Sequence, residues 1–542
     1  MPLTSVYRYH DGTKHHFHQF AASLGYLDWA SQPHPFRAFI GSPVFPLFPA
    51  PSVDAGGYAP AATTYDQLFD LGTPPQPISV AAIGDVLRHA LGLSAWKRFD
   101  RSRWSLRVNP SSGNLHPTEA YVICGAVPGL AGRPAVYHYA SDRHVLELRC
   151  GFEERAWMMA SGRDDLLLLA LTSIHWREAW KYGERAFRYC QHDLGHAMAA
   201  IGLAAALVGW RVWPLPAWSH RGIAALTGVD RAEDFVEAER EDPGCLLAMA
   251  PSRGPDGVTD EDRLVAAVGD GRWSGRASQL SEDHVEWRFI DEIARATRDP
   301  GHPADRASRV AAVGERAGRS CQLDARAIIL QRRSAVALDG RSTIDRLTFY
   351  AMLSRAMPGR DAPWSVMSWT PRIHLALFVH RVDDVAPGLY LLARDPEALD
   401  RLASACGRDF LWERVHDDLP LMCLARGECR SLAKRLSCDQ DIAADGFFSL
   451  GMIADFDAGL AAHGASFYRN LFWESGVVGQ VLYLEAEAAG ARSTGIGCFY
   501  DDPVHEVLGL QGHAFQSLYH FTVGMPVEDR RLTTEPGYPW EG

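Results

Sequence analysis

The sequence predicts an α+β protein built from two similar units that pack together within one chain as a pseudo-dimer. Its 542 residues exceed the roughly 250–300 at which a single hydrophobic core usually stops growing. Two long apolar segments, residues 187–211 and 468–492, align at a constant offset of 281. Residues 115–139 and 370–392 also align, at an offset near 254. Each half is therefore expected to contain two strands joined by a turn, followed by a long helix.

The two long segments have helical periodicity and end close to a glycine, as helices commonly do. The first, Arg185–Trp210, carries Gly195, Ala199 and Gly202, so we expect it to pack closely at the interface between the halves. The alternative is that two generic α+β units share a periodicity by chance. The residues paired at the offset of 281 are Arg188 with Arg469, Asp193 with Glu474, Gly195 with Gly476, Gly209 with Gly490 and Arg211 with Arg492.

The region between the repeats, residues 251–281, is rich in Pro, Gly, Asp and Ser, as domain boundaries often are. We predict an N-terminal domain over residues 1–255, a linker over 256–281 and a C-terminal domain over 282–542. Ser281 is expected to cap a helix that begins in the run after it, where acidic residues occupy the first turn.

Composition excludes several classes of protein. The formal net charge of −12 disfavours a nucleic-acid partner, because such proteins usually carry a basic excess. The longest apolar helical run is shorter than the roughly 20 residues that span a bilayer, so no membrane association is expected. The 10 cysteines are scattered without a CxxC pair, which favours neither a disulfide framework nor a structural zinc site. With no apolar signal core near the N-terminus, we predict a cytoplasmic protein.

A polar loop with two prolines precedes the first predicted strand, Ala120–Ala126. The loop, Asn109–Glu119, reads NPSSGNLHPTE. Proline fixes the backbone, glycine allows close approach of a flat ligand, and Ser and Asn offer short hydrogen-bonding arms. An ordinary polar turn is the alternative. The candidate ligand-binding residues of this loop are Pro110, Ser111, Ser112, Gly113 and Asn114.

Two further motifs lie in the second half. Arg332-Arg333-Ser334 follows a helical run, and two guanidiniums with a hydroxyl suit a phosphate dianion, although arginines are also common at solvated helix ends. The segment STGIGCF, residues 493–499, follows the second long helix, and its Gly495-Ile496-Gly497 step lets backbone atoms contact a planar cofactor. It is not a dinucleotide-binding GxGxxG motif, because it follows a helix instead of opening one.

These motifs together resemble the nitroreductase-like FMN flavoprotein superfamily. The resemblance rests on PSSGNLHP, the Arg-Arg-Ser triplet, and ESGVVGQVLYLEA leading to TGIGCFYDD, in that order along the chain. The most similar branch is the SagB-type dehydrogenases, here in a tandem form. The resemblance implies two nitroreductase-like units, each an antiparallel-rich sheet flanked by long helices. It covers most of both halves, and residues 1–80 and 251–281 match loosely.

The family resemblance implies one FMN held between the two units. Arg332, Arg333 and Ser334 would hold its phosphate together with a basic pair near the C-terminus, Arg530 and Arg531. The loop Pro110–Asn114 would border the flavin ring from the other unit, and Gly495–Gly497 would pack on it. The reverse combination is degraded, because residues 365–372 read SVMSWTPR without a Gly-Asn step and the first 80 residues lack a clear Arg-Arg-Ser triplet. One FMN site per chain is expected.

The SagB-type branch also carries a Lys-Tyr pair implicated in azoline oxidation, and Lys181-Tyr182 matches it here. A desolvated lysine can act as a general base, and tyrosine can relay a proton. Neighbouring residues of a regular helix do not share a face, so joint action requires a turn, which Gly183 permits. A surface lysine at a helix start is the alternative.

The predicted reaction is a two-electron oxidation of a carbon next to nitrogen, oxygen or sulfur, with FMN as acceptor. The resemblance implies an azoline in a modified peptide as substrate and other biosynthetic enzymes as partners; a small-molecule substrate is also open, as is further pairing of whole chains. One alternative is an NAD(P)H-dependent reductase of nitro or quinone compounds. Another is a non-catalytic partner protein of a biosynthetic complex.

Other polar clusters are expected to be structural. His10, His15, His16 and His18 lie close together in the sequence, but no carboxylate or cysteine arrangement accompanies them, so no metal site is predicted. Asp501-Asp502 is expected to form a turn and helix cap.

Overall fold

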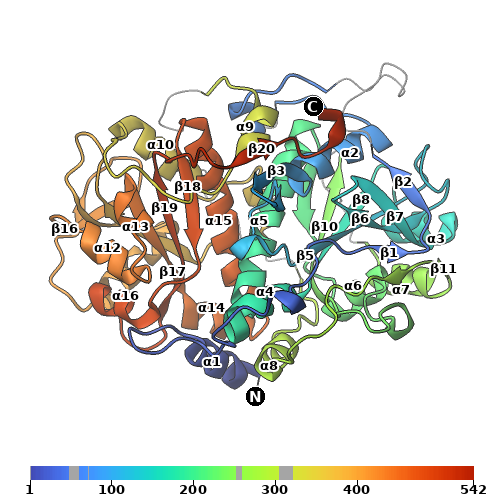
Figure 1. The fold of residues 1–542 in the computed structure, drawn as a ribbon, viewed down its shortest axis with the longest axis horizontal. Helices are drawn as coiled ribbons and strands as arrows, with labels where there is room; N and C mark the ends of the chain where they lie inside the picture. The colour runs from blue at the N-terminus through green and yellow to red at the C-terminus, as the bar shows by residue number, and fades with distance from the viewer. Residues whose placement is uncertain (1, 48–59, 71, 252–258, 304–320, 542) are drawn as a thin grey trace.

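The computed structural model describes residues 2–47, 60–70, 72–251, 259–303 and 321–541. Each half of the chain contributes one large antiparallel sheet. Two long helices, α5 (Ala186–Leu207) and α15 (Phe467–Ala488), pack against each other between the sheets, as Figure 1 shows. The predicted mixture of helices with antiparallel sheets is therefore confirmed.

The first sheet has eight strands in the order β11-β7-β6-β5-β8-β10-β9, with β2 added on β7. These strands are β2 (Val44–Pro46), β5 (Thr118–Cys124), β6 (Ala135–Ala140), β7 (Val145–Gly151), β8 (Leu167–Ser173), β9 (Arg211–Pro214), β10 (Asp242–Ala250) and β11 (Arg272–Trp273). The strand predicted after the Pro-rich loop, Ala120–Ala126, is β5, which begins and ends two residues earlier.

The second sheet has seven strands in the order β15-β16-β14-β13-β17-β19-β18. Its strands are β13 (Ile373–Val379), β14 (Gly388–Leu392), β15 (Glu413–Arg414), β16 (Leu421–Arg426), β17 (Phe448–Asp455), β18 (Arg492–Ile496) and β19 (Phe515–Gly524). Without the edge strand β15, this order repeats that of β7-β6-β5-β8-β10-β9 strand for strand. The repeat seen in the sequence therefore extends to the connectivity of the sheets.

The remaining helices cover the sheets and the ends of the molecule. They are α1 (Pro2–Gly12), α2 (Val80–Ala90), α3 (Glu154–Ser161), α4 (His175–Tyr182), α6 (His220–Thr227), α7 (Glu261–Gly269), α8 (Arg288–Ala296), α9 (Ala325–Gln331), α10 (Arg346–Ala356), α11 (Leu399–Ala405), α12 (Arg430–Leu436), α13 (Ile442–Asp445), α14 (Phe456–His463) and α16 (Asp501–Leu508).

The two central helices cross at a pair of glycines. Every residue of α5 is buried, and its second half, from residue 197 to 207, consists only of small and apolar residues. A Cβ atom on Gly195 would lie 2.1 Å from the carbonyl oxygen of Trp473, and one on Gly476 would lie 2.3 Å from that of His192. The expected close packing at Gly195 is confirmed, and its repeat partner Gly476 lies directly opposite.

Segments from the chain ends cross between the halves. Strand β20 (Thr533–Glu535), close to the C-terminus, pairs with β3 (Leu93–Phe99), which also pairs with β4 (Ser102–Arg107). The N-terminal helix α1 packs against α8 and contacts the second half through His10, which bonds to Gln516. Each end of the chain therefore lies against the opposite half.

The segment expected to be a linker is folded where the structure describes it. Helix α7 packs against α3 and α6, and β11 pairs with β7 in the first sheet. Strand β12 (Arg276–Ala277) pairs with β1 (Phe39–Ile40). The helix expected directly after Ser281 begins only at Arg288, because the Ser281 hydroxyl accepts a hydrogen bond from Trp176 instead of capping a helix. The domain boundaries stay a prediction.

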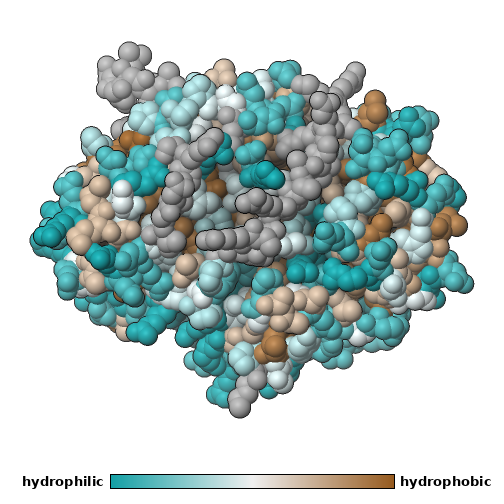
Figure 2. Space-filling view, turned by 180° about the vertical axis from the view of Figure 1, so that it is seen from behind, coloured by the Kyte–Doolittle hydropathy of each residue, from teal (hydrophilic) through white to brown (hydrophobic). Residues whose placement is uncertain are grey.

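Among the helices in the described part of the chain, none is long and apolar enough to cross a bilayer. The face seen in Figure 2 is mainly hydrophilic, and its hydrophobic residues form small separate groups. Scattered apolar residues of this kind are ordinary on a folded protein surface.

Candidate functional site

A cleft of about 470 Å³ lies between the halves, within the range of ordinary small-molecule sites. Its walls come from the loop after β4, the start of α5, the residues after α9, and strand β18 with the segment that follows it. The lining includes Lys97, Asn109–Asn114, His116, Tyr182, Tyr189, Asp193, His196, Arg332–Val336, Gln440, Tyr483, Arg492, Thr494–Cys498, Tyr519 and Pro526–Asp529. Residues predicted from three separate motifs therefore meet in one cavity.

The Pro-Ser-Ser-Gly-Asn loop is hydrogen-bonded to α5 through Asp193. The carboxylate of Asp193 accepts hydrogen bonds from the backbone N–H of Ser112 at 3.0 Å and from its hydroxyl at 3.1 Å. The Ser111 hydroxyl accepts from the N–H of His116 at 2.7 Å, and Asn114 donates to the carbonyl of Ser105 at 2.9 Å. The polar side chains of the loop thus fix its own backbone, which leaves the loop rigid at the cleft wall.

Gly113 brings this loop against the Lys181-Tyr182 pair. Its φ is 60°, and a Cβ atom there would lie 2.6 Å from the Tyr182 hydroxyl and 3.2 Å from Lys181 Nζ. The turn expected at Gly183 is present: α4 ends at Tyr182, and Gly183 has a φ of 56°. The turn lets both side chains lie close to the loop, although Tyr182 lines the cleft and Lys181 does not.

The two members of this pair differ in environment. Lys181 is exposed, so the desolvation on which a general-base role was argued is absent. Burial, and next the charge of Glu178, raises the pKa of Tyr182 well above its usual value. The phenol therefore keeps its proton near neutral pH and can donate a hydrogen bond, but it does not remove a proton.

Two buried carboxyl groups lie beneath the loop. Burial raises the pKa of Asp193 to about 7, against the hydrogen bonds from Ser111 and Ser112. Burial, and next the charge of Asp193, raises the pKa of Glu178 well above its usual value. At neutral pH, Asp193 and Glu178 together therefore hold at least one proton, next to the loop that lines the cleft.

Arg332 joins the two halves at the other end of the cleft. Its side chain is 3% exposed, and it donates to the carbonyls of Val108 at 3.0 Å and Arg107 at 3.1 Å. Its Nη1 atom is buried without a hydrogen-bond partner among the described residues. Burial lowers the pKa of Arg332. A buried guanidinium with an unused donor at a cleft wall is suited to an anion.

The neighbouring residues of the triplet are held differently. Arg333 donates to the carbonyls of Leu330 and Arg332, each at 2.7 Å, and to Ser94 in the first half at 3.0 Å. The exposed Ser334 shares a hydrogen bond of 2.9 Å with the Tyr483 hydroxyl. All three residues of the triplet line the cleft.

Gly495 and Gly497 line the cleft, but glycine is required at these positions because neighbouring tyrosine side chains occupy the space of a Cβ atom. A Cβ atom on Gly495 would lie 1.8 Å from the hydroxyl of Tyr519, and one on Gly497 would lie 2.5 Å from the ring of Tyr189. The Tyr189 hydroxyl also donates to the Gly497 carbonyl at 3.1 Å. These glycines make room for the two tyrosines, and Ile496 is buried between them.

The basic pair expected near the C-terminus lies outside the cleft lining. Arg531 is 74% exposed and pairs with Asp529, and Arg530 is exposed as well. Two other cations stand at the cleft instead: Lys97 on β3 and Arg492 on β18. Lys97 donates to Thr534 of β20 at 2.7 Å, so the C-terminal strand positions it.

Several cleft residues were not among the sequence-based candidates. Asp193 appeared in the repeat, paired with Glu474, and this pairing was the available signal: Glu474 likewise accepts from the N–H groups of Arg372 and Ile373 in the corresponding loop. No local pattern singled out Lys97, which reaches the cleft through pairing with the distant β20. His15 was expected to lack a cysteine neighbour, and the structure places its Nδ1 3.7 Å from Cys498 Sγ.

Part of the chain matches a known family. The model of the nitroreductase family matches residues 388–525, from β14 through β19. A relative named "Putative nitroreductase MJ1384", from Methanocaldococcus jannaschii, is 26% identical over 140 residues. That match covers 24% of this chain and 66% of the relative, so the chain spans just under two thirds of the relative's length.

Solved structures extend the likeness to the whole chain. The crystal structure of a "putative nitroreductase" from Anabaena variabilis has a TM-score of 0.70 at 20% identity and covers 96% of this chain and 99% of its own. A chain of the Escherichia coli microcin synthetase McbBCD complex covers 47% of this chain and 94% of its own, at a TM-score of 0.26 and 16% identity. The Anabaena variabilis structure shows that this chain has the nitroreductase fold over nearly its full length, and the family model identifies a nitroreductase-family domain at residues 388–525.

Proposed function

We propose that the chain is an FMN-dependent oxidoreductase that holds one FMN in the cleft between its halves. The observation that carries this proposal is the pairing, in one cavity, of a cationic end with a rigid polar loop. Arg332, Arg333 and Lys97 form the cationic end, and Pro110–Asn114 forms the loop. The cationic end suits a phosphate, and the polar loop suits a flat ring with hydrogen-bonding atoms.

The cleft residues fit FMN because they offer a buried hydrogen-bond donor for its phosphate and a cleft large enough to hold it. The unpartnered Nη1 of Arg332 supplies a buried donor for a phosphate oxygen, and the cleft volume of about 470 Å³ is adequate for a cofactor. Arg333, Ser334 and Lys97 would complete the phosphate end. Gly495–Gly497 and the loop would border the ring. Arg530 and Arg531 remain proposed as outer contacts, reached only if the segment before β20 moves.

Bound FMN would supply a two-electron acceptor for a carbon next to nitrogen, oxygen or sulfur. In the proposed reaction, the protein's own residues position the substrate and move a proton. Asp193 keeps the loop in place through Ser112, and the protonated Tyr182 donates a hydrogen bond into the cleft. Lys181 remains proposed as the proton acceptor because its Nζ lies at the Gly113 end of the loop, and this role requires that bound substrate bring the now exposed side chain into the cleft in its neutral form.

We further propose that the halves are related by a pseudo-two-fold axis and that only one of the two related sites is functional. At the offset of 281, Tyr483 and Arg492 correspond to Gly202 and Arg211, which line a separate cavity of about 170 Å³. Thr494 corresponds to Trp213, which also lines that cavity, and Gly495 corresponds to Pro214, which does not. The smaller cavity, and the tryptophan in place of Thr494, favour a single FMN per chain.

The substrate class follows from the SagB-type resemblance, which rests on Lys181-Tyr182 and the PSSGN loop. We propose an azoline in a modified peptide, oxidised to the azole, with other enzymes of the same biosynthetic route as partners. An absorbance assay of azole formation, with synthetic azoline peptides and oxygen as final acceptor, tests this part. If NADPH bleaches the flavin rapidly under anaerobic conditions while azolines do not, the chain is a nitro or quinone reductase.

Cofactor binding is tested with Arg332→Ala. We expect FMN affinity to fall about tenfold to hundredfold, because a desolvated phosphate loses a charged partner. The measurement is a fluorescence titration of FMN into cofactor-free protein, with the melting temperature recorded in parallel. Arg263→Ala is the matched control, since Arg263 is half exposed on α7, pairs with Asp260 three residues before it and lies outside the cleft lining.

If Arg332→Ala and Arg263→Ala bind FMN with equal affinity, Arg332 is not one of the residues that hold the phosphate. A colourless wild-type protein that takes up no added FMN would contradict the proposed function itself and favour a non-catalytic partner protein.

A further inference from the structure

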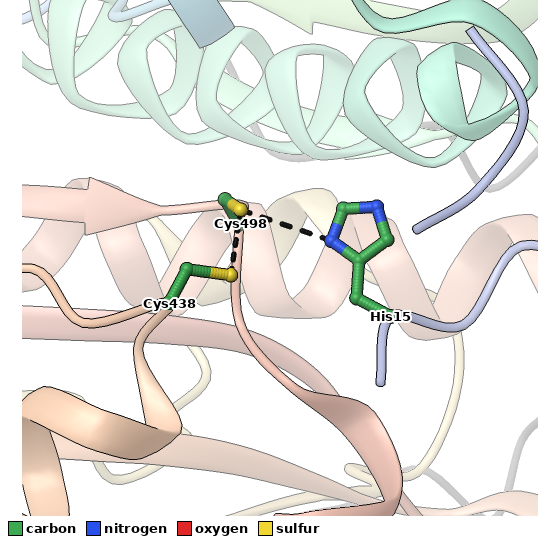
Figure 3. A group of neighbouring side chains, drawn as sticks. All are labelled: His15, Cys438 and Cys498. Carbon is green, nitrogen blue, oxygen red and sulfur yellow. Dashed lines mark hydrogen bonds between the residues drawn. The ribbon is translucent and has the colours of Figure 1, made fainter. Parts of the chain in front are cut away.

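A pair of cysteines and a histidine from three distant segments meet in one cluster, as Figure 3 shows, and one of the cysteines lines the cleft. Cys438 lies between α12 and α13, Cys498 follows β18, and their sulfur atoms are 2.7 Å apart. His15, just after α1, places its Nδ1 3.7 Å from the sulfur of Cys498. Both cysteines are half-buried, whereas seven of the other eight are buried.

The two sulfurs stand in different positions relative to the cleft. Cys498 is among the residues that line it, and Cys438 is not. A molecule in the cleft therefore meets Cys498 first, with Cys438 directly behind it. This order is the one required of an attacking cysteine and a resolving cysteine.

The charges around Cys498 favour its thiolate. Asp501 forms ion pairs of 2.9 Å with both Arg185 and Arg188, and all three side chains are buried, so two guanidiniums share one carboxylate. The hydrogen bond with Cys438, then His15 and Arg185, lower the pKa of Cys498 against the effect of burial. Burial also lowers the pKa of His15, which leaves a neutral imidazole able to accept the thiol proton.

We propose that Cys498 and Cys438 form a redox-active dithiol site that reduces a low-molecular-weight disulfide entering from the cleft. Cys498 and Cys438 are outside the set of residues assigned to FMN, although Cys498 lines the same cleft, and the proposed step uses no bound cofactor.

The proposed step balances without a further oxidant. The Cys498 thiolate attacks one sulfur of the disulfide R–S–S–R, which forms a mixed disulfide and releases one RS⁻. Cys438 then loses its proton and attacks the sulfur of Cys498, which forms the Cys438–Cys498 bond and releases the second RS⁻. Two cysteine thiols are oxidised, the substrate is reduced to two thiols, and the two protons lost by the cysteines end on the released thiols.

The three donor atoms lie within 4.8 Å of one another, so the same group could also hold a metal ion. A closed structural zinc site uses four protein ligands, and this group supplies three among the described residues. Metal binding by both cysteines would contradict the proposal.

The test uses the reduced full-length protein and oxidised glutathione in the absence of air. We expect two equivalents of glutathione to be released per chain and peptide mass spectrometry to find a Cys438–Cys498 disulfide. Cys438→Ser should retain glutathione on Cys498 as a mixed disulfide. Cys498→Ser should slow the release of glutathione at least about tenfold, because the activated thiolate is lost.

Cys321→Ser is the matched control, since Cys321 is the third half-buried cysteine and lies outside the cleft lining. This variant should release glutathione at the wild-type rate. The proposal is overturned if glutathione attaches to Cys321 with no Cys438–Cys498 bond formed. It is equally overturned if added Co²⁺ alone gives a thiolate charge-transfer band that requires both cysteines and blocks the reaction.

Discussion

Lys97 carries a positive charge into the cleft from a strand whose neighbours belong to different halves. Burial, and next repulsion by Arg333, lowers the pKa of Lys97, so an anion placed between these two cations would relieve an unfavourable interaction. Arg531, which the sequence suggested for this role, is instead 74% exposed and neutralised by Asp529. Lys97 is therefore expected to contribute to anion binding, and Arg531 is expected to contribute little.

A pair of variants separates these two cations. Lys97→Ala is expected to weaken FMN binding about threefold to tenfold, as a half-buried charged contact is lost. Arg531→Ala is expected to change it less than twofold, because exposed ion pairs contribute little. Titrations at low and high salt measure both. A larger effect for Arg531→Ala than for Lys97→Ala would indicate that the C-terminal segment, and not Lys97, contacts the phosphate.

Asp193 links the cleft loop to the pH dependence of stability. Its folded pKa of about 7 lies above the usual value near 4, so between these values the folded chain holds a proton that the unfolded chain has lost. Stability from this group is therefore full below about pH 4 and falls as the pH rises to about 7, by on the order of 4 kcal/mol at most.

Asp193→Asn removes this titration and keeps hydrogen-bonding atoms at the same place. We expect the melting temperature of the variant to fall less than that of the wild type between about pH 4 and pH 7. Asp262→Asn, an exposed aspartate on α7, serves as the control and should follow the wild type. Parallel curves for Asp193→Asn and wild type would contradict the raised pKa.

At the scale of elements, the sequence predicts well what local patterns determine. The apolar periodicity of residues 187–211 and 468–492 predicted α5 and α15 closely, and the small residues predicted their close contact. The helix expected at Ser281 begins later, because Ser281 is engaged by Trp176 from another segment. Lys97 and the Cys438–Cys498–His15 cluster could not be predicted, since each depends on segments that only the tertiary fold brings together.

The crossing of α5 and α15 gives a prediction about packing. Gly195→Ala would put a methyl group 2.1 Å from the Trp473 carbonyl oxygen, so the helices must separate. We expect a loss of about 1–3 kcal/mol, typical of overpacking, and weaker FMN binding because the cleft spans both helices. Gly269→Ala in α7 is the control, as a Cβ atom there meets nothing within 4 Å. Thermal unfolding of both variants measures the difference in stability. If the two variants are equally stable, the helices accommodate the methyl group without cost, which contradicts the prediction.

At the scale of the whole molecule, each half anchors a short helix in the same way. Arg188 of α5 donates from Nε to the hydroxyl of Thr13, the residue after α1, at 3.0 Å. Arg469 of α15, its partner in the repeat, donates from Nε to the hydroxyl of Thr297, the residue after α8, at 2.9 Å. This correspondence, together with the matching strand orders, is what a pseudo-dimer of two related units would produce.

A split chain tests whether the site needs both halves. A cut near residue 265 would divide α7, which packs on the first half, so the break belongs in the exposed run 282–286 before α8. We expect fragments 1–284 and 285–542 to retain no FMN when expressed separately, because Arg332 lies on one and the 110–114 loop on the other. Co-expression should give a one-to-one complex with a flavin absorbance spectrum. If either purified fragment alone retained FMN with the affinity of the intact chain, the cofactor would belong to that half.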